Sequence, residues 1–336
     1  MRSAVFVEAG QPLVIETREM PRPGLNQALI RVERCGICGS DLHMTSGSPF
    51  DVASGTALGH EYAGEVVELG PGESRLKIGD RVTAVPISGC GECPACLADT
   101  PLHCASMTSM QGGYGEFTLV DQRQAVRLPE LLSFADGALV EPLASALRGV
   151  RRLKLDADTR VAVIGAGAIG AASIFWARRR GAGRIATIAR TQRNAELAGT
   201  MGSDAFLTTG EDIVARLHEA LGGAPDIVIE GAGAPGAIQQ GVELVKVGGT
   251  ILSLGGCIKP DSFMPVIAMA KEVNLQFSVA YGLSEFQEAV TAFDGDRISP
   301  RAMVGETISL AELPARFEAM RSNSHAAKVM VNPHAH

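Results

Sequence analysis

The sequence is poor in aromatic residues and in long apolar runs. Aromatic side chains make up 4% of the 336 residues, with one tryptophan and three tyrosines, so no aromatic platform for stacking sugars stands out. The longest uncharged run, residues 161–177, contains three glycines and is shorter than the ~20 residues of a membrane-spanning helix. We therefore expect no transmembrane segment and no membrane partner.

Positive charge is also scarce. The net charge is -7, and the only basic cluster is Arg178-Arg179-Arg180, so the chain lacks the electrostatic footprint of a nucleic-acid-binding protein. The opening residues, MRSAVFVEAGQPL, contain no apolar core of the kind found in secretory signals, and we expect a cytoplasmic protein. In that compartment the seven cysteines indicate metal binding or catalysis rather than disulfides.

The pattern of predicted strands and helices changes twice along the chain. Up to about residue 145, short strands alternate with Gly and Pro, which predicts an irregular β-rich domain. From about 148 to 280, apolar strands such as RVAVIG, RIATIA and DIVIEG are each followed by a helical pattern, at 168–180, 193–201 and 237–245. This alternation predicts an α/β fold with a doubly wound parallel sheet. After 280 come short helices and a last strand, AKVMVN.

A glycine motif follows the first of these strands. In VAVIGAGAIG, Gly165, Gly167 and Gly170 have the G-x-G-x-x-G spacing, between a strand and a helix. The first glycine makes the tight turn, the second lets the backbone approach a pyrophosphate, and the third allows close helix packing. The first N–H groups of the helix, around Ala168 and Ile169, would face the phosphates. The motif predicts a dinucleotide site, with tight packing alone as the alternative.

The second strand of this unit lacks the expected acidic residue. An Asp or Glu at its end usually binds the adenine ribose of NAD. Here the strand ends at Ala189 and is followed by Arg190, with Arg193 shortly after. Guanidinium groups can bind a 2′-phosphate through paired hydrogen bonds, so we predict NADP. The alternatives are a solvated turn, or NAD with Arg190 stacked on the adenine.

Two groups of potential metal ligands occur before residue 145. The first is compact: Cys90, Cys93, Cys96 and Cys104 lie within GCGECPACLADTPLHC, and four thiolates form the closed tetrahedral site of structural zinc. The second is dispersed over CGICGSDLH, GHEYAG and VEPL, which supply Cys38, Ser40, Asp41, His43, His60, Glu61 and Glu141. One Cys, one His and one carboxylate leave a position open for substrate, as catalytic zinc requires.

These motifs together resemble the zinc-dependent medium-chain alcohol dehydrogenases, close to the sorbitol and threonine dehydrogenase branch. The resemblance runs over nearly the whole chain and includes CGICGSDLH, GHEYAGEVVELG with IGDRV, the four-cysteine lobe, EPL and VIGAGAIG. It implies a GroES-like β-rich catalytic domain formed by residues 1–147 and 280–336, with the structural zinc lobe at 88–105. A Rossmann dinucleotide-binding domain, residues 148–279, would be inserted between these two segments.

The resemblance also implies a catalytic zinc. Cys38 and His60 would be ligands of this ion. Glu61 and Glu141 would be alternates for a single carboxylate position. Cys90, Cys93, Cys96 and Cys104 would hold a second, structural zinc, giving one catalytic and one structural ion per chain.

The remaining roles follow from the same resemblance. Ser40 would accept the proton of the alcohol, and His43 would pass it through the cofactor ribose to solvent, with Asp41 orienting a ligand. We therefore expect an oxidoreductase transferring hydride between NADP(H) and a secondary alcohol, a polyol or the corresponding ketone; the alternative is an NAD-dependent, sorbitol-like polyol dehydrogenase. The expected partners are a small-molecule substrate and further copies of the chain, as a dimer or a homotetramer. A non-catalytic zinc-stabilised binding protein would have no need for the family spacing shared by Cys38, Ser40, His43, His60 and a carboxylate.

Overall fold

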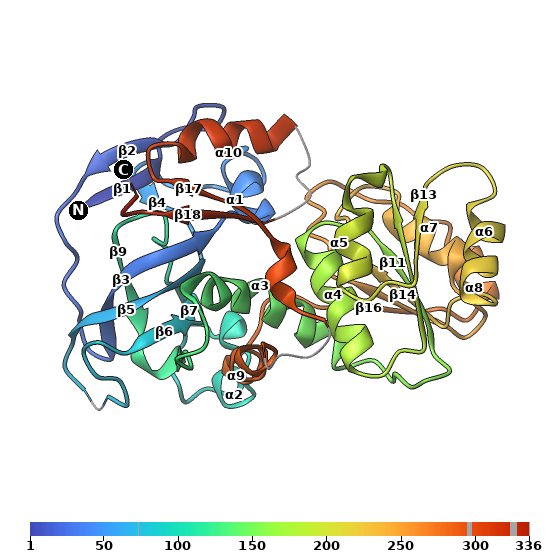
Figure 1. Ribbon diagram of the computed structural model, residues 1–336, viewed down its shortest axis with the longest axis horizontal. Helices are drawn as coiled ribbons and strands as arrows, with labels where there is room; N and C mark the ends of the chain where they lie inside the picture. The colour runs from blue at the N-terminus through green and yellow to red at the C-terminus, as the bar shows by residue number, and fades with distance from the viewer. Residues whose placement is uncertain (73, 294–297, 323–327, 336) are drawn as a thin grey trace. The chain divides into compact units, whose positions relative to one another are not determined.

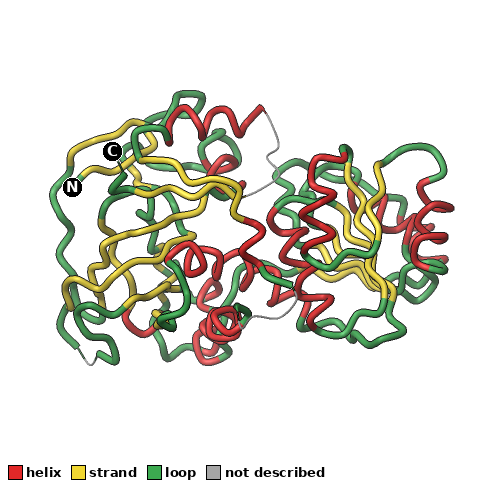
Figure 2. The backbone as a smooth tube through the Cα atoms, viewed as in Figure 1, coloured by secondary structure: helices red, strands yellow, loops and turns green. Residues whose placement is uncertain are grey.

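The computed structural model describes residues 1–72, 74–293, 298–322 and 328–335 (Figures 1 and 2). The chain divides into two units. Unit 1 comprises Met1–Ala144, Tyr281–Asp294 and Val304–His336, and unit 2 comprises Ser145–Ala280 and Gly295–Met303. The first boundary falls within a helix, α3 (Phe134–Val150).

Unit 1 is built around a mostly antiparallel sheet. Its strands are β3 (Gln27–Gly36), β5 (Glu61–Leu69), β6 (Arg81–Ala84), β9 (Phe117–Asp121), β10 (Ala125–Arg127), β17 (Val304–Ser309) and β18 (Lys328–Asn332). They run in the order β10-β6-β5-β3-β18-β17, and β9 also pairs with β3. Strand β3 is central because it pairs with β5, β9 and β18. Its end therefore lies beside the start of β5, with Gly36 opposite Glu61.

Smaller elements surround this sheet. The other strands are β1 (Arg2–Phe6), β2 (Val14–Thr17) and β4 (Thr56–Ala57), in the order β2-β1-β4, and the paired β7 (Ile87–Ser88) and β8 (Thr108–Ser109). The helices besides α3 are α1 (Gly39–Met44), α2 (Pro94–Leu97), η1 (Pro101–His103), η2 (Gln122–Gln124), α9 (Leu283–Thr291) and α10 (Leu313–Ser322). The core of the unit includes Tyr62, Tyr114 and Phe317, each almost fully buried.

Unit 2 contains the parallel sheet that the sequence predicts. Its strands are β11 (Arg160–Ile164), β12 (Arg184–Ala189), β13 (Ala205–Thr208), β14 (Ile227–Glu230), β15 (Thr250–Ser253) and β16 (Asn274–Phe277). The order is β13-β12-β11-β14-β15-β16, and neighbouring strands are parallel. The order reverses between β11 and β14, the place where open α/β sheets bind ligands beyond their carboxyl ends. The predicted doubly wound fold is confirmed.

Helices cover both faces of this sheet (Figure 2). They are α4 (Ala168–Arg179), η3 (Gln192–Asn194), α5 (Ala195–Thr200), α6 (Ile213–Leu221), α7 (Ala237–Leu244), α8 (Pro265–Ala270) and η4 (Pro300–Met303). The helix expected at 193–201 begins as the short η3 turn, at whose end the Asn194 side chain donates to the Ala166 carbonyl (2.6 Å). No helix within the described ranges is both long and apolar enough to cross a bilayer.

The first test concerns the packing of α4 on β11. A Cβ added at Gly170 would lie 2.0 Å from the Gly165 carbonyl oxygen, whereas one added at Gly199 would meet nothing within 4 Å. Because overpacking typically costs about 1–3 kcal/mol, we expect Gly170→Ala to destabilise unit 2 by that amount. Gly199→Ala, in helix α5, should raise stability by up to about 1 kcal/mol.

The measurement is urea unfolding followed by the fluorescence of Trp176, the single tryptophan, which is 1% exposed in helix α4. Equal midpoints for the two variants would contradict the close approach of Gly170 to the glycine turn.

Candidate functional site

The short helix α1 presents most of the dispersed residues. It starts directly after Cys38, its N-cap residue, and contains Ser40, Asp41 and His43. Asp41 is fully buried, whereas Ser40 is exposed and His43 half-buried. The Asp41 carboxylate turns back to the start of its own helix, where Oδ2 lies 3.4 Å from the Cys38 backbone nitrogen. This contact fixes the turn that carries the Cys38 thiol.

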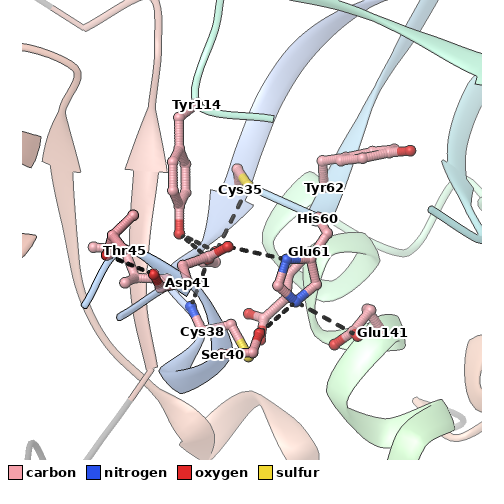
Figure 3. Close-up of polar contacts among 12 residues, drawn as sticks. Cys35, Cys38, Ser40, Asp41, Thr45, His60, Glu61, Tyr62, Tyr114 and Glu141 are labelled. Carbon is pink, nitrogen blue, oxygen red and sulfur yellow. Dashed lines mark hydrogen bonds and ion pairs between the residues drawn. The ribbon is translucent and has the colours of Figure 1, made fainter. Parts of the chain in front are cut away.

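His60 is held by Asp41. It directly precedes β5 and is 9% exposed, and its Nδ1 lies 3.2 Å from Asp41 Oδ1. The other ring nitrogen, Nε2, lies 3.4 Å from Ser40 Oγ and 3.9 Å from Glu141 Oε1 (Figure 3). A carboxylate at one nitrogen is the usual way in which proteins orient a metal-binding histidine toward its ion. The arrangement therefore leaves Nε2 for a ligand.

The pKa values of this pair reflect their contact. Burial opposes ionisation of Asp41, yet His60, the Tyr114 hydroxyl and the Cys38 amide hold the pKa of Asp41 below its usual value. Burial likewise opposes the charge of His60, but Asp41 outweighs it and raises the pKa of His60 well above its usual range. The site thus favours a cation at the imidazole. A bound metal ion would supply positive charge in place of the proton.

Tyr114 completes the surroundings of Asp41. Its hydroxyl donates to Asp41 Oδ2 at 2.5 Å, and its ring is fully buried against Phe317. A buried carboxylate is costly unless it is hydrogen-bonded, and Tyr114 supplies a second donor beside the Cys38 amide at the start of α1. No sequence motif predicts this role of Tyr114. No sequence signal points to this donor, because the burial of Asp41 that requires it is known only from the structure.

Glu61 is paired with a lysine that no sequence motif identifies. Lys328, the first residue of β18, is 5% exposed and donates to Glu61 Oε1 (2.6 Å) and the Ile37 carbonyl (3.2 Å). Burial disfavours its charge, but Glu61 outweighs this effect and raises the pKa of Lys328 above its ordinary value. The second oxygen, Glu61 Oε2, is buried without a hydrogen-bond donor among the described residues. Such an oxygen is suited to a metal ion.

Glu141 lies on the other side of His60. It is buried in the middle of α3, where Pro142 follows it, and it interacts with the Tyr281 hydroxyl. Burial raises the pKa of Glu141 to about 7, with Glu61 adding to the rise and with His60 and Tyr281 opposing it. A carboxyl group with this pKa can either donate or accept a proton near neutral pH.

Candidate ligand atoms of Cys38, His60 and Glu61 all lie within 4.8 Å of one another. A thiolate, an imidazole and a carboxylate are a donor set that zinc accepts, so these residues fit the ion that the sequence predicts. Glu141 adjoins this group through His60. His43 lies one helical turn beyond Ser40 on α1.

The four-cysteine group also comes together. The thiols of Cys90, Cys93, Cys96 and Cys104 lie within 4.8 Å of one another, on the loop after β7, the start and body of α2, and the residue after η1. The Cys90 and Cys96 sulfurs are 3.9 Å apart. A Cβ at Gly89 would lie 2.5 Å from the Cys96 sulfur, so the chain approaches the cluster closely.

The thiols of this cluster cannot all ionise on their own. Backbone N–H groups of Glu92 and Cys93 lower the pKa of Cys90 to about 6. The Gly91 N–H also favours the thiolate of Cys96, yet burial and the neighbouring thiols raise the pKa of Cys96 to about 12. A divalent cation would remove this conflict, because it stabilises all four thiolates together. The cluster therefore fits a closed metal site.

In unit 2, the glycine turn has the geometry that a phosphate needs. Gly165 has φ +93°, and a Cβ there would lie 2.8 Å from the Ala232 backbone nitrogen, whereas a Cβ at Gly167 would meet nothing within 4 Å. Gly167 is the N-cap of α4, whose first N–H groups, including those of Ala168 and Ile169, receive no side-chain cap. Open space in front of free amide donors is suited to a pyrophosphate.

Arg190 and Arg193 lie beside this turn. Strand β12 pairs with β11 up to Ile188 and ends at Ala189. The exposed Arg190 follows, and η3, which contains Arg193, is tied to the glycine turn by the Asn194–Ala166 hydrogen bond. The structure thus brings the arginines to the carboxyl edge of the sheet next to the glycine motif.

Glu230 is a further residue of this edge that the sequence analysis did not single out. It ends β14 and is 2% exposed. Its Oε1 accepts from the Ala232 and Gly233 amides, each at 2.7 Å, and its Oε2 from Ser253 Oγ at 3.1 Å. Glu230 therefore ties the loop after β14 to the end of β15.

Comparison with known proteins agrees with this geometry. Residues 24–130 match the alcohol dehydrogenase GroES-like domain, and residues 168–295 match the zinc-binding dehydrogenase model. The chain is 31% identical over 335 residues to the (R,R)-butanediol dehydrogenase of Bacillus subtilis, covering 95% of this chain and 96% of the relative. It is 27% identical over 332 residues to a sorbitol dehydrogenase of Halalkalibacterium halodurans, covering 95% of each.

A solved structure is similar over the same extent. The crystal structure of a Sinorhizobium meliloti protein bound to NADP superposes with a TM-score of 0.88 at 29% identity, covering 99% of each chain. The resemblance deduced from the motifs is therefore confirmed. The chain belongs to the zinc-dependent medium-chain alcohol dehydrogenases, a family of oxidoreductases.

Proposed function

We propose that this chain is a zinc dehydrogenase that uses NADP(H) to interconvert a secondary alcohol or polyol and the corresponding ketone. The observation that supports the proposal most strongly is the convergence of Cys38, His60 and a buried carboxylate at one point. Such a donor set leaves a tetrahedral zinc with a position for substrate. The butanediol and sorbitol dehydrogenases among the relatives support the substrate class.

Zinc held there would act as a Lewis acid toward the substrate oxygen, while the nicotinamide would carry the hydride. The protein's part is to orient groups and to move a proton. Asp41 would hold His60 so that Nε2 faces the ion. We assign to Ser40, whose hydroxyl lies 3.4 Å from that nitrogen, the acceptance of the substrate's proton, and to His43, one turn further along α1, its passage toward solvent.

Two carboxylates compete for the last protein ligand position. Glu61 lies in the same group as Cys38 and His60, and one of its oxygens is held by Lys328. Glu141, with its pKa near 7, would release its proton when a cation binds nearby. We propose that these two residues are alternates, one binding the ion while the other lies beside it.

The cofactor assignment rests on Arg190 and Arg193. Strand β12 ends at Ala189, so no carboxylate at that position would repel a 2′-phosphate, and Arg190 is exposed directly beyond it. The NADP-bound relative from Sinorhizobium meliloti supports this choice. The alternative is an NAD-dependent polyol dehydrogenase in which Arg190 stacks on the adenine, and the similarity to sorbitol dehydrogenase supports its substrate class.

The cofactor assignment predicts a preference that one residue controls. A hydrogen bond to a charged group contributes about 1.5–3 kcal/mol, so we expect Arg190→Ala to lower kcat/KM for NADPH by roughly ten- to a hundredfold. The value for NADH should change little. The measurement is kcat/KM for both cofactors on a panel of ketones. Arg184→Ala, at the opposite end of the same strand, is the matched control and should leave the preference unchanged.

Equal use of the two cofactors by the wild type, or a preference for NADH, would show that the strand end does not select the cofactor.

The catalytic metal assignment predicts that Cys38→Ser loses turnover and about one zinc per chain while the circular dichroism spectrum stays that of the wild type. The hydroxyl is a far weaker zinc ligand than the thiolate. Cys35→Ala is the control, because Cys35 is buried three residues earlier and lies outside both ligand groups. It should retain metal and turnover. Full activity of Cys38→Ser would exclude Cys38 as a catalytic ligand.

The structural metal assignment predicts a different result for Cys96→Ser. Because binding at a closed site stabilises the fold directly, this variant should lose about one zinc per chain and unfold at a lower temperature. Zinc is measured by elemental analysis and unfolding by thermal circular dichroism. Unchanged zinc content and unchanged unfolding would argue against metal binding by the four cysteines.

A further inference from the structure

Asp99 is a charged residue of the four-cysteine lobe whose side chain contacts a helix outside the lobe. It follows α2, and its backbone N–H donates to the Cys96 carbonyl at 3.0 Å. Its φ of 55° lies in the left-handed region, which few residues other than glycine adopt readily. The conformation of the lobe therefore fixes the position of the Asp99 backbone.

The Asp99 carboxylate caps the start of α9. Oδ1 accepts from the Leu283 N–H at 2.7 Å, and Oδ2 accepts from the Ser284 N–H at 2.8 Å. These residues are about 184 positions away in the sequence, and Figure 1 shows α2 and α9 next to each other. A carboxylate is favoured at a helix N-terminus because it satisfies free amides and complements the helix dipole.

The approach of the two segments is as close as a glycine permits. A Cβ at Gly282 would lie 2.2 Å from Asp99 Cγ and 2.3 Å from the Asp99 carbonyl oxygen. The Gly282 N–H itself donates to Glu285 Oε2 at 2.7 Å. Three successive amides at the start of α9 are thus held by two carboxylates, one of them supplied by the lobe.

Tyr281 directly precedes Gly282, the N-cap residue of α9. Its ring is 6% exposed and packs edge-on against Phe286 of α9, with centroids 5.0 Å apart. Its hydroxyl interacts with Glu141, whose Oε1 lies 3.9 Å from His60 Nε2. The position of the Glu141 carboxylate beside the candidate metal ligands therefore depends on where α9 begins.

We infer that Asp99 is a positioning residue: it transmits the fold of the four-cysteine lobe to the catalytic constellation, by capping α9 so that Tyr281 holds Glu141 beside His60. This inference rests on the proposed dehydrogenase function for its activity readout. It gives the lobe a role in the reaction in addition to its role in stability. The contacts that form the connection all lie within unit 1.

The test uses Asp99→Asn, which keeps the size of the side chain but replaces one acceptor oxygen with a donor that faces an N–H group. Glu92→Gln is the matched control, because Glu92 is an exposed acid of the same lobe and its replacement removes the same charge. Tyr281→Phe and the double variant Asp99→Asn/Tyr281→Phe complete a double-mutant cycle. Each protein is assayed as the zinc-loaded, full-length chain with NADPH and NADH on the ketone panel.

We expect Asp99→Asn to lower kcat roughly tenfold, since small misplacements of catalytic groups have effects of that order or larger, while KM for the cofactor and zinc content stay unchanged. Tyr281→Phe should lower kcat similarly, and the double variant should be no worse than Tyr281→Phe alone. Hydrogen exchange should be about tenfold faster at the Leu283 and Ser284 amides in Asp99→Asn. Glu92→Gln should match the wild type in each measurement.

Two results would overturn the inference. One is an unchanged kcat in Asp99→Asn despite faster exchange at the start of α9. The other is a double variant whose loss equals the product of the two single losses, because Asp99 and Tyr281 would then act independently. A wild type inactive with both cofactors would instead refute the proposed function, and the exchange measurement would still report on the cap.

Discussion

The buried carboxylate of Asp41 is the constraint on which the arrangement of unit 1 depends. A buried charge must be met by donors or by opposite charge, and Asp41 meets both needs with groups from three parts of the chain. These are the start of its own helix, the histidine before β5, and the tyrosine between β8 and β9. The fold thus cannot satisfy Asp41 without bringing Cys38 and His60 together. Stability and site geometry have the same physical cause here.

The features that depend on local motifs were the ones that the sequence predicted most firmly. The spacing of Cys38, Ser40 and His43 determines their places on one short helix, and the glycine spacing fixes the turn into α4, so both could be read from a few consecutive residues. The four-cysteine group could be predicted equally well, because its members lie within fifteen residues of one another in the sequence. The doubly wound sheet followed from the alternation of apolar and helical segments, which depends on neighbouring residues alone.

Partners that lie far away in the sequence could not be read in this way. Lys328 meets Glu61 only because β18 is inserted beside β3, and nothing in AKVMVN indicates that pairing. Asp99 reaches α9 across some 184 positions, and Glu230 ties two loops whose contact requires the sheet order. The predicted domain bounds at 147/148 and 279/280, the roles of Ser40 and His43, and the choice between Glu61 and Glu141 stay predictions. They depend on ligands and on domain geometry rather than on spacing.

The placement of β18 also has a consequence for synthesis of the protein on the ribosome. This strand, residues 328–332, lies between β3 and β17 in the main sheet of unit 1 and supplies the cation for Glu61. The sheet of unit 2, in contrast, uses strands between residues 160 and 277. Since domains generally fold as units while the chain emerges, unit 2 can complete its sheet during translation. The sheet of unit 1 must wait for residues 328–332, so β3 and the other early strands emerge long before β18 can pair.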